Sequence, residues 1–203
     1  MQIRDERGFS LNELLVSVAV IGIVMAGIAT LLASGSQTYL TGANQIESQQ
    51  AARALLQRMA QEIQGAGYDP QGLAGAAPLG CPWSAIVGPS PGFGAPTATS
   101  LTIQSDNDGN GCIGAAERIW YTLAGTALQR QDFAVDVTPQ TILDGVQALT
   151  FVYLDEDGNP AGAPAAIRSV DIQLTVRPER QAATWQAGRV AVTVRDRVRV
   201  RNR

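Results

Sequence analysis

The chain contains no histidine and no lysine, so all 15 of its basic residues are arginine. The absence of histidine excludes Ser-His-Asp triads, histidine general bases and histidine metal ligands. Aromatic residues make up only 5% of the 203 residues, and the net charge is −3. General nucleic-acid-binding proteins carry a basic excess, which is missing here. We therefore expect a non-enzymatic protein that requires no cofactor.

A single long apolar run is present near the N-terminus. Residues 14–33 contain no charged side chain, and about 20 such residues span a hydrocarbon core of about 30 Å. The sequence therefore predicts one transmembrane helix with its N-terminus in the cytoplasm. A removable signal peptide is the alternative, because residues 33–35 weakly match a cleavage site.

Glu13 lies at the start of this apolar run. A carboxylate at the edge of the bilayer core costs free energy unless it has a partner, which makes Glu13 a functional candidate. The alternative is a structural role in the first turn of the helix, where a negative charge interacts favourably with the helix dipole.

Residues 8–15 read GFSLNELL and follow a short polar leader, residues 1–8. This pattern resembles the cleavage and methylation motif of type IV prepilins and pseudopilins. The resemblance implies that prepilin peptidase cuts between Gly8 and Phe9 and methylates the new N-terminal Phe9. It also implies that Glu13 neutralises the N-terminal amine of a neighbouring subunit in a filament.

Apolar residues continue at helical spacing as far as Ile63, and Arg53, Arg58 and Glu62 fall on the polar face, which we expect to be exposed to water. We expect one helix over residues 9–64, on the order of 80 Å long. A Gly/Pro-rich loop over residues 65–99 follows.

Short apolar runs alternate with turn signals in the remainder of the chain and predict a β head domain over residues 100–203. The expected strands cover residues 100–104, 118–123, 127–131, 142–154, 167–177 and 189–201. The predicted fold class is α+β, with the long helix packed on an antiparallel β-sheet, as in type IV pilins. Four segments are similar to PilW-like minor type IV pilins, namely residues 66–70, the Asp/Gly-rich turn near 106–111, residues 145–159 and residues 198–202.

Residues 106–117 satisfy a calcium-loop pattern with Asp106, Asp108, Asn110, the carbonyl oxygen of Cys112 and Glu117 as ligands. Ile113 at the eighth position is expected to pack into apolar surroundings. The flanking segments resemble strands rather than the usual helices, so a metal-free β-turn is the alternative.

Cys81 and Cys112 are the two cysteines, and both follow the predicted membrane span. An even pair outside the cytoplasm predicts a disulfide.

Arginines at alternate positions from Arg195 to Arg203 predict a strand with a basic face and a valine face. We favour an exposed face that pairs with acidic residues such as those at 155–157. Binding to nucleic-acid phosphates is the alternative.

Together these patterns predict a minor type IV pilin, with prepilin peptidase, other pilins and the inner membrane as partners. It is expected in the inner membrane before assembly and in an extracellular pilus afterwards. The alternatives are a minor pseudopilin of a type II secretion system, in a periplasmic pseudopilus, and a membrane-anchored calcium- or DNA-binding module.

Overall fold

The computed structural model describes residues 10–70, 92–94, 96–110, 113–177 and 191–202. The chain forms two compact units, Met1–Ala43 and Asn44–Arg203. The expected cleavage site and both cysteines lie outside the described residues, so the cut after Gly8 and the disulfide Cys81–Cys112 stay predictions.

One helix, α1 (Leu11–Gln64), is long and apolar enough to cross a membrane. In the first unit its large apolar side chains are exposed, with Ile23 and Leu31 more than 70% accessible. Within the described residues, nothing in the protein itself covers the most apolar window of α1.

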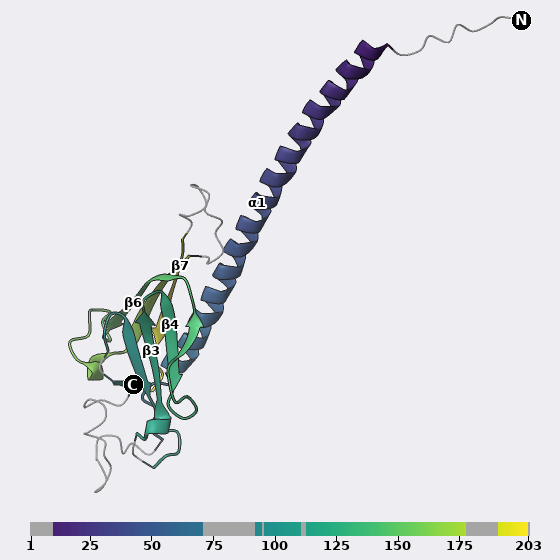
Figure 1. The fold of residues 1–203 in the computed structure, drawn as a ribbon. Helices are drawn as coiled ribbons and strands as arrows, with labels where there is room; N and C mark the ends of the chain where they lie inside the picture. Colours follow the sequence, from purple (N-terminus) through teal and green to yellow (C-terminus); the bar gives the residue numbers. More distant parts are fainter. Residues whose placement is uncertain (1–9, 71–91, 95, 111–112, 178–190, 203) are drawn as a thin grey trace, which may run out of the picture. The chain divides into compact units, whose positions relative to one another are not determined.

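The second unit contains two antiparallel sheets (Figure 1). The five-stranded sheet has the order β1-β2-β3-β4-β5 and the three-stranded sheet the order β6-β7-β8. The strands are β1 (Phe93–Gly94), β2 (Ser100–Gln104), β3 (Arg118–Ala124), β4 (Ala127–Asp132), β5 (Gln140–Leu143), β6 (Val146–Leu154), β7 (Ser169–Val176) and β8 (Val192–Arg199). The predicted α+β class is confirmed, but the expectation of one sheet is wrong.

The segment at residues 142–154, which we expected to form one strand, contains two strands that belong to different sheets. Gly145 separates them and has a φ of 74°, a backbone conformation that glycine adopts without strain. As a result β5 pairs with β4, whereas β6 pairs with β7.

The core of the second unit joins α1 to both sheets. The C-terminal part of α1 buries Ala52, Leu55, Leu56, Met59 and Ile63. Strand β7 buries every second residue, as expected of a strand with one face on a core. The Tyr153 hydroxyl on β6 donates to the Ser100 carbonyl of β2 at 3.2 Å and thereby links the two sheets.

Helix α1 ends beside the five-stranded sheet. Gly67 follows the last turn with a φ of 73°, and its backbone N–H donates to the Gln104 carbonyl at 2.8 Å. A backbone hydrogen bond therefore joins the end of the helix to strand β2.

Candidate functional site

The start of α1 is an N-terminal cap built from Ser10 and Glu13. The Ser10 hydroxyl accepts a hydrogen bond from the Glu13 backbone N–H at 3.3 Å. Ser10 and Glu13 have the spacing of a capping box, which is a local sequence signal for the beginning of a helix. Glu13 is exposed in the first turn, where its charge suits the helix dipole and its carboxylate is accessible to another molecule.

Four glycines of α1 in the first unit have open space where a side chain would be. A Cβ atom added at Gly22, Gly27, Gly35 or Gly42 meets nothing within 4 Å. Packing within the subunit therefore does not require glycine at these positions.

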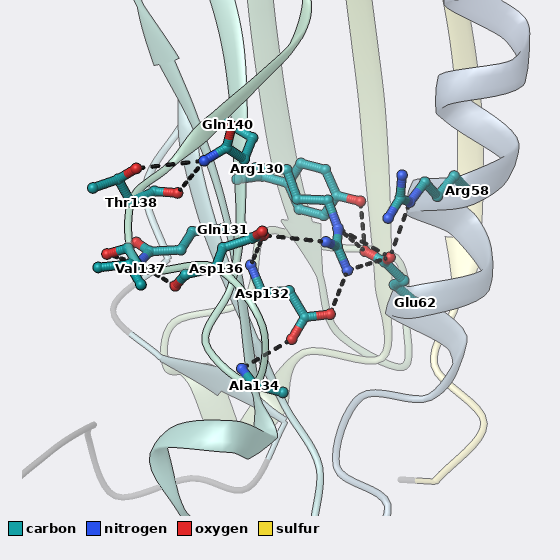
Figure 2. A network of polar contacts seen from close by, with 11 residues as sticks. Arg58, Glu62, Arg130, Gln131, Asp132, Ala134, Asp136, Val137, Thr138 and Gln140 are labelled. Atoms are coloured by element: carbon teal, nitrogen blue, oxygen red, sulfur yellow. Dashed lines mark hydrogen bonds and ion pairs between the residues drawn. The ribbon is translucent and has the colours of Figure 1, made fainter.

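A polar network connects α1 to strands β3 and β4 (Figure 2). The Glu62 carboxylate accepts a hydrogen bond from the Tyr121 hydroxyl and forms an ion pair with Arg130 at 3.0 Å. Arg58, one turn away on α1, also contacts Glu62 at 3.3 Å. The expectation that Glu62 faces water is therefore wrong. Its partners Tyr121 and Arg130 lie far along the chain, so helical spacing alone does not reveal them. Arg53 and Arg58 are exposed as expected.

The electrostatics of this network follow from its burial. Burial raises the pKa of Tyr121 well above its ordinary value of 10.0, and the neighbouring Glu62 carboxylate raises it further against the opposing effect of Arg130. Burial lowers the pKa of Arg130, but its hydrogen bond and charge interaction with Glu62 outweigh this and raise that pKa overall. The network thus holds one carboxylate between a neutral hydroxyl and a permanent cation.

Arg130 also extends the network into the loop after β4. Its guanidinium contacts Asp132 at 3.1 Å and Asp136 at 4.0 Å. Breaking a buried pair on one side leaves an uncompensated charge, so the buried Arg130 guanidinium needs an acidic partner.

The segment at residues 106–117, which we call the acidic loop, brings together three of its predicted calcium ligands. Carboxylate oxygens of Asp106, Asp108 and Glu117 lie within 4.8 Å of one another, and Ile113 is buried as expected. Cys112 lies outside the described residues. Three converging carboxylates are a donor set that suits Ca²⁺.

The same carboxylates also hold the loop closed by hydrogen bonds. Glu117 Oε1 accepts from the Asn107 N–H at 2.6 Å, and Glu117 Oε2 accepts from the Gly114 N–H at 2.8 Å. Asp106 Oδ1 accepts from the Gly109 N–H at 2.8 Å. These bonds hold the described part of the loop without a cation, so the calcium ligand set stays a prediction.

The arginine strand has the predicted alternation. Val198 and Val200 are buried, whereas Arg195, Arg197 and Arg199 are exposed. Asp196 interrupts the valine series and is exposed.

The acidic partner of Arg197 is Asp171 on β7, with 2.7 Å between Nη2 and Oδ2. The hydrogen bond from Arg197 lowers the pKa of Asp171. No contact between an arginine of this strand and the residues at 155–157 is seen in the part of the chain that the structure describes. Part of the basic charge is therefore neutralised within the sheet.

Comparison with known proteins adds one match. The model of the prokaryotic N-terminal methylation motif matches residues 3–29, a segment that contains Gly8, Phe9 and Glu13. No curated protein matches the chain. The exposed apolar helix and this motif together indicate a type IV pilin-like or pseudopilin-like prepilin. A prepilin-type motif implies membrane anchoring before assembly, processing by prepilin peptidase and assembly with other pilins.

Proposed function

We propose that the protein is a minor type IV pilin. Prepilin peptidase cuts it between Gly8 and Phe9, and α1 then packs among the helices of other subunits. The observation that carries this proposal is the methylation motif at residues 3–29, continuous with a helix whose apolar side chains are exposed in the first unit. Exposure of this apolar surface to water costs free energy, which is avoided when a membrane or other apolar helices cover it.

In this proposal Glu13 has a role between subunits. Its exposed carboxylate in the first turn of α1 accepts the positive amine of Phe9 from a neighbouring subunit. A charge at the edge of the bilayer core becomes tolerable when it is paired in this way. The exposure of Glu13 supports the role, because no partner within the described residues occupies its side chain.

The first experiment measures processing in the source cells. The intact mass of the native protein is expected to correspond to a chain that begins at N-methylated Phe9. Gly8→Val is expected to leave the chain uncut. A native protein that still begins at Met1 would contradict the proposal and favour a membrane-anchored binding module.

The second experiment measures assembly with a matched pair of variants. Glu13→Gln is expected to be processed normally but to be depleted from isolated filaments. Glu47→Gln makes the same chemical change at another exposed site of α1 and should leave assembly intact. Deletion of the gene is expected to reduce piliation; loss of protein secretion with normal piliation would instead indicate a pseudopilin of a type II secretion system.

A further inference from the structure

The face of the three-stranded sheet that points away from the core carries an excess of positive charge. Strand β8 places Arg195, Arg197 and Arg199 on this outer face, at alternate positions and all exposed. Asp171 on β7 is the acid that the described strands add to the same face, and it already forms an ion pair with Arg197. Arg195 and Arg199 form no ion pair with any described residue. Two cations are therefore uncompensated here, although the net charge of the chain is −3.

Uncharged polar side chains surround the arginines on the outer face. Gln173 on β7 is directly opposite Arg195, and Thr150 on β6 is directly opposite Gln173. These residues line a hollow of about 450 Å³, so side chains of a partner have room to approach Arg195. No aromatic side chain of the described strands lies on this face, which is unlike the stacking surfaces that bind single-stranded nucleic acids.

An exposed turn of opposite charge, residues 155–159, follows β6. The Asp155 carboxylate accepts hydrogen bonds from the Asp157 N–H at 3.0 Å and from the Asn159 N–H at 2.8 Å. Asp155 is therefore occupied by the turn itself. Glu156 and Asp157 are exposed and form no ion pair with any described residue. The turn thus presents two uncompensated carboxylates on a backbone that its own hydrogen bonds hold in place.

The acidic turn and the arginines belong to opposite edges of one sheet. The strand order β6-β7-β8 makes β6 and β8 the two edges. Adjacent strands lie about 4.8 Å apart, so the two edges are about 10 Å apart. In the part of the chain that the structure describes, no ion pair joins the turn to an arginine of β8. A second copy, in contrast, can bring its turn to the arginines of the first and compensate both sets of charges.

We propose that the three-stranded sheet binds a second copy of this chain head to tail, with the 155–159 turn of one copy against Arg195 and Arg199 of the next. Glu156 and Asp157 supply the carboxylates. Charge complementarity supports this pairing, because turn against turn or arginine against arginine is repulsive. The contact is heterologous, so each pair of copies keeps one free turn and one free set of arginines for further copies.

The contact goes beyond the proposed function. It uses only the second unit and requires neither the cut after Gly8 nor the role of Glu13. Exposed ion pairs are individually weak, so we expect low affinity in dilute solution. Such a contact becomes effective where copies are held close together, as on a membrane.

The first test uses the absence of lysine from the chain. Arg195→Lys or Arg199→Lys keeps the positive charge and adds the sole lysine side-chain amine, which a carbodiimide joins as an amide to a carboxylate in contact with it. The full chain in detergent at low salt is prepared as a mixture of isotope-labelled and unlabelled copies. Mass spectrometry is expected to find the lysine of one copy joined to Glu156 or Asp157 of another.

The matched control for this chemistry is Arg58→Lys. Arg58 contacts Glu62 on the same helix, so its lysine is expected to crosslink within one copy only. Crosslinks from Arg195→Lys and Arg199→Lys that stay within one copy, that join other carboxylates, or that fail to form overturn the inference.

The second test reverses the charges of each surface in turn. One variant combines Arg195→Glu with Arg199→Glu, and the other combines Glu156→Arg with Asp157→Arg. Each alone is expected to weaken self-association of the full chain roughly tenfold in sedimentation velocity, with little change in Tm because all four side chains are exposed. An equal mixture of the two variants is expected to restore association, because opposite charges meet again. Normal association of either variant alone, or no recovery in the mixture, overturns the inference.

Salt and a DNA probe separate this contact from nucleic-acid binding. Self-association of the native chain is expected to fall as the salt concentration rises from about 50 mM to about 500 mM. Duplex DNA that binds the native chain and not the double arginine variant, without self-association of the chain, overturns the inference. Processing at Phe9 and depletion of Glu13→Gln from filaments report on the proposed function alone, so the failure of either proposal is seen separately.

Discussion

The Glu62 carboxylate on α1 forms an ion pair at 3.0 Å with Arg130 on β4, although 68 positions separate them in the chain. Tyr121 from β3 completes the site by donating its hydroxyl to the same carboxylate. One acid on the helix is thereby held by two neighbouring strands of the five-stranded sheet. These directional contacts fix where the C-terminal part of α1 lies on the sheet. Apolar packing is not directional and fixes that position less strictly.

Replacement of Glu62 should destabilise the second unit. Glu62→Gln removes the charge that compensates Arg130, and we expect a loss of about 2 kcal/mol in the free energy of unfolding. Urea denaturation of the full chain in detergent measures this loss. Glu47→Gln, exposed on the same helix, should change stability by less than about 0.5 kcal/mol. Equal stability of the two variants would contradict the role of Glu62.

Stability should fall in alkaline solution because of Tyr121. Its pKa is raised in the folded state, so the contribution is fully present below the unfolded pKa of about 10 and is lost as the pH rises above it. Tyr153, whose pKa is raised by burial, adds to the effect. Tyr121→Phe is expected to flatten the decline between about pH 9.5 and pH 11.5, measured by urea denaturation. A decline of the same slope in wild type and variant would show that this hydroxyl is not the titrating group.

The loop at residues 106–117 should depend on Glu117 even without a metal. Glu117→Gln weakens three hydrogen bonds from backbone N–H groups and is expected to cost about 1–3 kcal/mol in the presence of a chelator. The calcium hypothesis adds that Ca²⁺ raises the Tm of the native protein and not that of the variant. The same Tm for the native protein in Ca²⁺ and in chelator would exclude calcium as a stabilising ligand.

Two glycine substitutions should have opposite effects. Gly42 lies within α1, and a Cβ atom added there meets nothing within 4 Å, so Gly42→Ala should stabilise the surrounding turns by about 1 kcal/mol. Gly125 has a φ of 63°, so Gly125→Ala should destabilise the β3–β4 turn by about 1 kcal/mol. Hydrogen exchange at the neighbouring amides measures both effects. Faster exchange around Gly42→Ala would mean that this glycine has another role.

The elements of this fold are easier to predict from the sequence than their association. Apolar periodicity locates the long helix, and alternation with turn residues locates most strands. The division into two sheets is harder to predict, because the apolar run at residues 142–154 resembles one strand, although Asp144-Gly145 is a turn signal within it.

The candidate sites show the same limit. Glu13 and the acidic loop are local motifs, so spacing along the chain is enough to find them. Glu62 has its decisive partners on β3 and β4, and a helical projection places it on the polar face.

The cap at the beginning of α1 has a consequence for maturation. Ser10 and Glu13 both lie on the retained side of the proposed cut, and they supply the hydrogen bond that starts the helix. The precursor and the processed chain can therefore begin α1 at the same residue, so cleavage by the peptidase does not require the helix to unfold. In the proposed maturation, removal of the leader changes the chemistry of the chain terminus, while the hydrogen bond that starts α1 is retained.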